Sequence, residues 1–89
     1  MTPEQTVFLR ENLLMQLASA RPLGLLVPRL SQGARMGGFY LSDAELEAQL
    51  AVLQKKGLVQ TQADPIAITM PPHWLITEAG LKELDSRGY

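Results

Sequence analysis

The stretch LSDAELEAQLAVLQKKGLV, residues 41–59, carries the clearest structural signal in the sequence. Ser42 is a favoured N-cap residue, and Glu45, three positions later, is placed to hydrogen-bond back to the N–H of the cap. Leucines then recur at i, i+4 and i+7, on one helix face: Leu46, Leu50 and Leu53. Gly57 is typical of a helix end. The stretch predicts a helix from about Ser42 to Gly57 that buries its leucines.

A longer helix is predicted upstream, from Thr2 to about Ala20, where Arg21-Pro22 stops it. Thr2 and Gln5 have the spacing of a second capping box. Apolar residues occupy most of the circumference of this helix, and a helix of that kind is usually buried on two sides. One side would face the domain's own core. We expect the other to form a homodimer through four apolar residues: Val7, Phe8, Leu9 and Leu13.

The remaining segments alternate between helix and strand signals. In chain order they are a short helix from Pro28 to about Gly37, a bridge or brief strand at Phe39–Leu41, strands at Leu58–Gln62 and His73–Ile76, and a final helix from Thr77 to about Gly88. Between the strands, Ile66–Met70 also has β character, and Pro71-Pro72 ends it. The pattern predicts one α+β domain over residues 1–89, mostly helical, with a three-helix core, a β-hairpin and a C-terminal helix.

The composition bounds the kind of protein. With 89 residues, 46% of them hydrophobic and 19% charged, the chain has the make-up of one folded domain. It has no cysteine and a single histidine, so we expect no disulfide, no metal and no cofactor. No apolar run approaches the roughly 18 residues of a membrane span. The N-terminus lacks a basic, signal-like segment, so we expect a cytoplasmic protein without a membrane partner.

Two separated segments resemble a known family. The run Leu41–Leu46 through Leu53–Val59, followed by Trp74–Leu81, is similar to the winged-helix domains of bacterial transcriptional regulators. In those domains the third helix ends in a K-G-L-V step, a hairpin wing follows, and an L-T-x-x-G element returns to helix. Ile76 stands here where that element usually has leucine. The resemblance covers about Leu26 to Leu84. The chain also resembles the small winged-helix proteins encoded by Mu-like prophages.

The resemblance implies that the helix Ser42–Gly57 enters the major groove of double-stranded DNA and that the hairpin touches phosphate or the minor groove. Opposite the leucines, its outward face carries three alanines and one lysine. Segment 21–41 holds three arginines and no acid, a local charge of +3, and is the expected source of phosphate contacts. The predicted DNA-binding set is Arg29, Arg35, Ser42, Ala44, Ala48, Ala51 and Lys55.

Other features favour an alternative, a protein–protein interaction or assembly module without DNA binding. The formal net charge is −1, whereas DNA-binding domains are usually basic. Residues 60–74 hold no Lys or Arg, and their apolar, proline-rich composition suits packing against protein. A stripe of alanines also suits close packing by another helix. No nucleophile motif, buried acid pair or phosphate loop is present, so an enzyme is not expected. These residues favour the interaction module, whereas the resemblance favours DNA binding. Of the two, we predict a dimeric DNA-binding transcriptional regulator.

Overall fold

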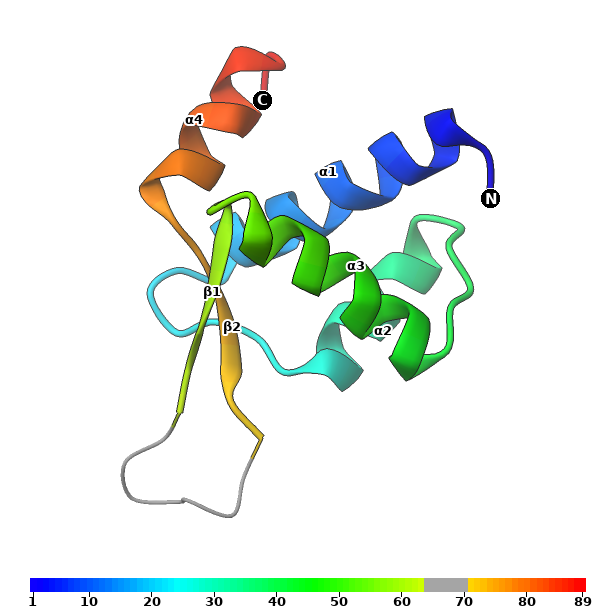
Figure 1. Ribbon diagram of the computed structural model, residues 1–89, viewed down its shortest axis with the longest axis horizontal. Coiled ribbons are helices and arrows are strands. Elements are labelled where there is room, and N and C mark those ends of the chain that lie inside the picture. The colour runs from blue at the N-terminus through cyan, green and yellow to red at the C-terminus, as the bar shows by residue number, and fades with distance from the viewer. Residues whose placement is uncertain (64–70) are drawn as a thin grey trace.

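The computed structural model describes residues 1–63 and 71–89 (Figure 1). Within that part of the chain lie four helices and one antiparallel hairpin, in the order α1 (Pro3–Ser19), α2 (Val27–Met36), α3 (Asp43–Lys55), β1 (Val59–Gln62), β2 (His73–Ile76) and α4 (Glu78–Ser86). The predicted α+β class, with a three-helix core, a hairpin and a C-terminal helix, is confirmed. The hairpin projects away from the helices, and the two chain ends lie on the opposite side (Figure 1). The β character predicted for Ile66–Met70 lies outside the described residues.

The start of α3 has the predicted cap. The Ser42 hydroxyl accepts a hydrogen bond from the Glu45 N–H at 3.2 Å, and the Ser42 N–H donates to the Glu45 carboxylate at 3.1 Å. The predicted leucine face is buried, with all three side chains no more than 1% exposed: Leu46, Leu50 and Leu53. Gly57 follows the helix with φ +76°, a left-handed value that favours glycine. Local capping and the leucine spacing therefore determine this helix together.

The core corrects the expected dimer face of α1. Four leucines of this helix are buried within the chain itself: Leu9, Leu13, Leu14 and Leu17. Leu9 and Leu13 are 0% exposed, so they do not reach a second subunit as predicted. They turn inward because the core receives side chains from α2, α3, the hairpin and α4 together. Val7 and Phe8 remain at the surface, with 40% and 58% of their area exposed.

The hairpin is attached to the rest of the fold by a buried pair of strand residues and by a bridge that the sequence did not indicate. Val59 pairs with Ile76 in the antiparallel register, and both side chains are buried. Leu25, just before α2, forms an isolated bridge with Trp74, with hydrogen bonds of 2.9 and 2.8 Å. The prediction of a bridge or strand at Phe39–Leu41 is wrong. There the Phe39 N–H bonds back to the Ala34 carbonyl, which closes the end of α2 instead.

Candidate nucleic-acid interface

The outward face of α3 is the candidate interface. Its four predicted residues are all exposed: Ala44, Ala48, Ala51 and Lys55. They recur at i, i+4, i+7 and i+11, so they lie in one row along the helix, opposite the buried leucines. Small side chains let another surface approach the helix backbone closely. The face offers methyl groups along most of its length and an amino group at its C-terminal end.

Charge changes sign along α3. Asp43, Glu45 and Glu47 are exposed in its first half, and Lys55 and Lys56 are exposed at its end. Hydrogen bonds from the Ser42 backbone and hydroxyl lower the pKa of Glu45, so this acid is firmly ionised at neutral pH. Acids at a helix N-terminus stabilise the helix, but they repel phosphate. The C-terminal half of α3 is therefore the part whose charge suits a nucleic-acid backbone.

The two predicted arginines of α2 lie on different sides of that helix. Arg35 lines a hollow together with Asp43, at the start of α3. Arg29 lines a different hollow with Asn12 and Gln16 of α1. The structure thus brings Arg35 next to α3 and leaves Arg29 beside α1. Ser42, the remaining predicted residue, is exposed, but its hydroxyl is engaged in the cap of α3.

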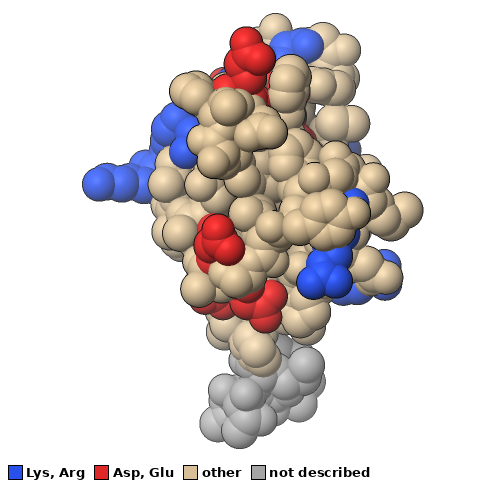
Figure 2. Space-filling view, turned by 90° about the vertical axis from the view of Figure 1, so that its right-hand side faces the viewer, with Lys and Arg blue, Asp and Glu red and all other residues tan. Residues whose placement is uncertain are grey.

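Basic side chains do not form a continuous strip on the face that contains the N-terminus and the turn between α2 and α3. Figure 2 shows Lys and Arg at separate edges of this face, with Asp and Glu between them. A mixed surface of this kind gives a weak field for steering a polyanion. Contacts to phosphate on this side would therefore depend on single residues.

A cluster of charges between α1 and α4 could not be predicted from the sequence. The Arg87 guanidinium donates to Glu11 at 2.7 Å and to Glu83 at 2.9 Å. The Tyr89 hydroxyl donates to the second oxygen of Glu11, also at 2.7 Å. The bond from Tyr89, followed by the bond and charge of Arg87, lowers the pKa of Glu11. The two contacts with Glu11 join residues more than 70 positions apart, for which no local pattern exists.

Arg10 joins α1 to α3. Its Nε donates to the Gln49 side-chain oxygen at 3.0 Å, on the flank of α3 between the leucines and the alanines. The sequence places Arg10 on an apolar side of α1, which favours a side chain that extends its charged end to the surface. The structure shows a partner for that charged end. The contact adds a polar link between α1 and α3 to the burial of the α3 leucines in the core.

Within residues 1–63 and 71–89, no group of three or more His, Asp or Glu side chains is placed to hold a metal ion. None of the helices described is long and apolar enough to cross a membrane. Comparison of the chain with protein-family models, with curated proteins and with solved structures found no match.

Proposed function

We propose that this protein binds double-stranded DNA through the outward face of α3 and acts as a dimeric transcriptional regulator in the cytoplasm. The observation that carries the proposal is the exposed row Ala44, Ala48, Ala51 and Lys55 on a helix whose opposite face is buried. A major groove about 12 Å wide admits an α-helix, and alanine methyls can contact thymine methyls. The winged-helix resemblance of the sequence assigns the same role to this helix.

The charges favour one orientation on DNA. Lys55 and Lys56, at the C-terminal end of α3, would lie against the phosphate backbone, and Arg35 would add a contact from α2. The acids in the first half of α3 would face the open groove or solvent. The alanines make no bidentate contact with a base edge, so direct readout of sequence would be limited. With so few phosphate contacts, binding by one copy would be weak, and its affinity would fall with salt only in proportion to those contacts.

Dimerisation would double the phosphate contacts. Exposed apolar side chains near the start of α1 support a symmetric interface there, with Val7 and Phe8 exposed by 40% and 58%. Val7 and Phe8 are the two residues of the predicted interface that are exposed, because Leu9 and Leu13 belong to the core.

A titration of a labelled, random-sequence DNA duplex tests the proposal. Fluorescence anisotropy at low salt should show saturable binding that weakens as salt rises, because bound counterions are released from the phosphates. Arg35→Ala should weaken binding to all sequences and reduce the salt slope by about 1. Arg29→Ala removes the same charge on the α1 side of α2, and we expect a smaller effect. Absence of salt-sensitive binding by the wild type would reject the proposal.

A second candidate is a protein-interaction module in which another helix packs against α3. Two large apolar side chains support it, because Met36 is 87% exposed at the end of α2 and Tyr40 is 78% exposed in the turn before α3. Contiguous exposed apolar groups mark protein contacts more often than phosphate contacts. Tight binding of a protein partner that Met36→Ser abolishes, without any binding of DNA, would favour this candidate.

A further inference from the structure

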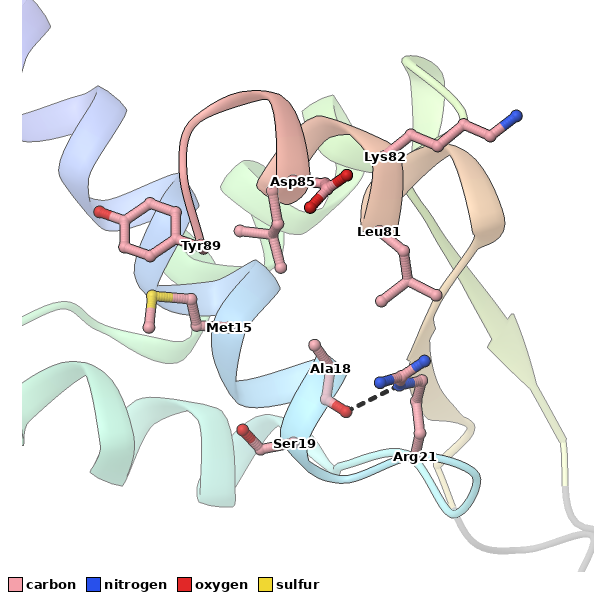
Figure 3. Close-up of a pocket in the computed structure, with 9 residues that line it drawn as sticks. Met15, Ala18, Ser19, Arg21, Leu81, Lys82, Asp85 and Tyr89 are labelled. Atoms are coloured by element: carbon pink, nitrogen blue, oxygen red, sulfur yellow. Dashed lines mark hydrogen bonds between the residues drawn. The ribbon is translucent and has the colours of Figure 1, made fainter.

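A hollow of about 490 Å³ lies between the C-terminal half of α1 and α4 (Figure 3). No residue of α3 lines it. Its walls are mainly apolar, from Met15 and Ala18 on α1 and from Leu81 and Leu84 on α4. Small-molecule sites are typically concave, mostly apolar and of a few hundred cubic ångströms, with a few polar groups at defined places. Size and lining therefore suit a small organic molecule with an apolar body.

One cation is fixed at the edge of this hollow. The Arg21 Nε donates to the Ala18 carbonyl at 2.9 Å, which holds the guanidinium beside Leu81 (Figure 3). Within the part of the chain that the structure describes, the terminal nitrogens of Arg21 contact no carboxylate. A guanidinium with two free N–H groups pairs with a carboxylate in a bidentate manner. Lys82 also borders the hollow, but its amino group extends away from it (Figure 3).

The remaining polar groups limit the charge of the occupant. Asp85, on α4, borders the same hollow and repels a second negative charge. The bordering charges are Arg21 and Lys82 against Asp85, which sum to +1. The Tyr89 ring forms part of the wall, held by its hydrogen bond to Glu11. A single anionic group at Arg21 and an uncharged body elsewhere match this arrangement.

We propose that the hollow binds a small monocarboxylic acid, with the carboxylate on Arg21 and the apolar body along Met15, Ala18 and Leu81. This site goes beyond the proposed DNA binding and does not depend on it, because no residue of α3 takes part. Its test uses no DNA, so either proposal can fail while the other stands.

The test is a titration of the ¹⁵N-labelled protein followed by two-dimensional amide NMR. Three probes separate the contributions: octanoate carries both the chain and the charge, octan-1-ol carries the chain alone, and acetate carries the charge alone. Octanoate should give saturable shifts at the amides of Ala18, Arg21, Leu81 and Asp85. The other two probes should bind at least about tenfold more weakly, since each lacks one of the two contacts.

Variants identify the carboxylate contact. Arg21→Gln should weaken octanoate about tenfold and leave octan-1-ol unchanged, because a charge-assisted hydrogen bond is lost. Arg21→Lys keeps the charge and should restore part of the affinity. Arg29→Gln removes the same charge outside the hollow and should have no effect. The proposal is wrong if octanoate shifts other amides, if it gives no saturable shift, or if Arg21→Gln weakens both octanoate and octan-1-ol equally.

Discussion

Gly80 of α4 lies so close to the carbonyl oxygen of Leu58 that a Cβ atom at this position would overlap it. Around this contact, the Thr77 N–H donates to the same carbonyl at 3.1 Å, and the Thr77 hydroxyl accepts from the Gly80 N–H, also at 3.1 Å. The Thr77 hydroxyl donates in turn to the Gly57 carbonyl at 2.6 Å. One threonine and one glycine thus join the end of α3 to the start of α4. This arrangement explains physically why threonine and glycine occur three residues apart here.

Gly80→Ala should destabilise the fold by about 2 kcal/mol, as overpacking against a fixed group does. Helix propensity alone predicts the opposite sign, because alanine is favoured over glycine by up to ~1 kcal/mol. Gly33→Ala in α2 is the matched control. A Cβ there meets the end of the Gln16 side chain, which can move, so we expect a smaller loss. Chemical denaturation measures the free energy of unfolding of both variants. A Gly80→Ala variant more stable than the wild type would contradict the inference that the Leu58 carbonyl leaves no room for a Cβ atom.

The Glu11 cluster predicts a dependence of stability on pH. The pKa of Glu11 is lowered in the folded protein by Tyr89 and Arg87, so its contribution to stability is present above the unfolded pKa. That contribution is lost as the pH falls below the ordinary value of 4.5 and through the folded pKa. Glu11→Gln should therefore lower the melting temperature at neutral pH. The difference in melting temperature between the wild type and this variant should disappear in acid.

Glu47→Gln is the control for this experiment, because it removes a carboxylate that is exposed on α3 and has no hydrogen-bonded partner among the described residues. Thermal unfolding followed by circular dichroism between neutral and acid pH provides the measurement. A gap between the wild type and Glu11→Gln that stays constant down to acid pH would show that ionised Glu11 does not stabilise the contact of α4 with α1.

The exposed face of α1 predicts self-association. Phe8→Ser should shift the protein toward the monomer, because Phe8 is 58% exposed and makes up much of the apolar surface of this helix. Met36→Ser changes an even more exposed apolar side chain on α2, and it should leave the dimer intact. Sedimentation velocity over a range of concentrations measures the change. A wild-type monomer at high micromolar concentration, or equal effects of the two variants, would rule out this interface.

Elements encoded by neighbouring residues were predictable. The capping box at Ser42 and Glu45 and the leucine face after it act over one or two helix turns, so the sequence shows them directly. The strand His73–Ile76 and the cap at Thr77 were predicted for the same reason. The resemblance to winged-helix regulators stays a prediction, because the confirmed element order defines a fold class and does not define a function.

Contacts between distant residues were not predictable. The bridge of Leu25 with Trp74 involves one residue on each side and leaves no periodic pattern. The apolar residues of α1 cover nearly the whole circumference, so periodicity could not separate the buried Leu9 from the exposed Phe8. Arg29 and Arg35 are six positions apart, which alone places them on different sides of α2. The packing of α2 against α1 and α3 decides which helix each arginine lies beside, and the sequence does not show that packing. The sequence therefore predicted which residues of α3 form its exposed face, but not how the arginines of α2 lie relative to that face.

The affinity of Ala48→Glu for a random DNA duplex at low salt tests the central claim most directly. The change places a carboxylate in the middle of the exposed row of α3, where it would meet the groove and its phosphates. Ala79→Glu makes the same change at an exposed position of α4 and controls for net charge. With both variants folded by circular dichroism, we predict that Ala48→Glu abolishes binding and that Ala79→Glu binds as the wild type does. Equal affinities of the two variants would contradict the claim that α3 enters the groove.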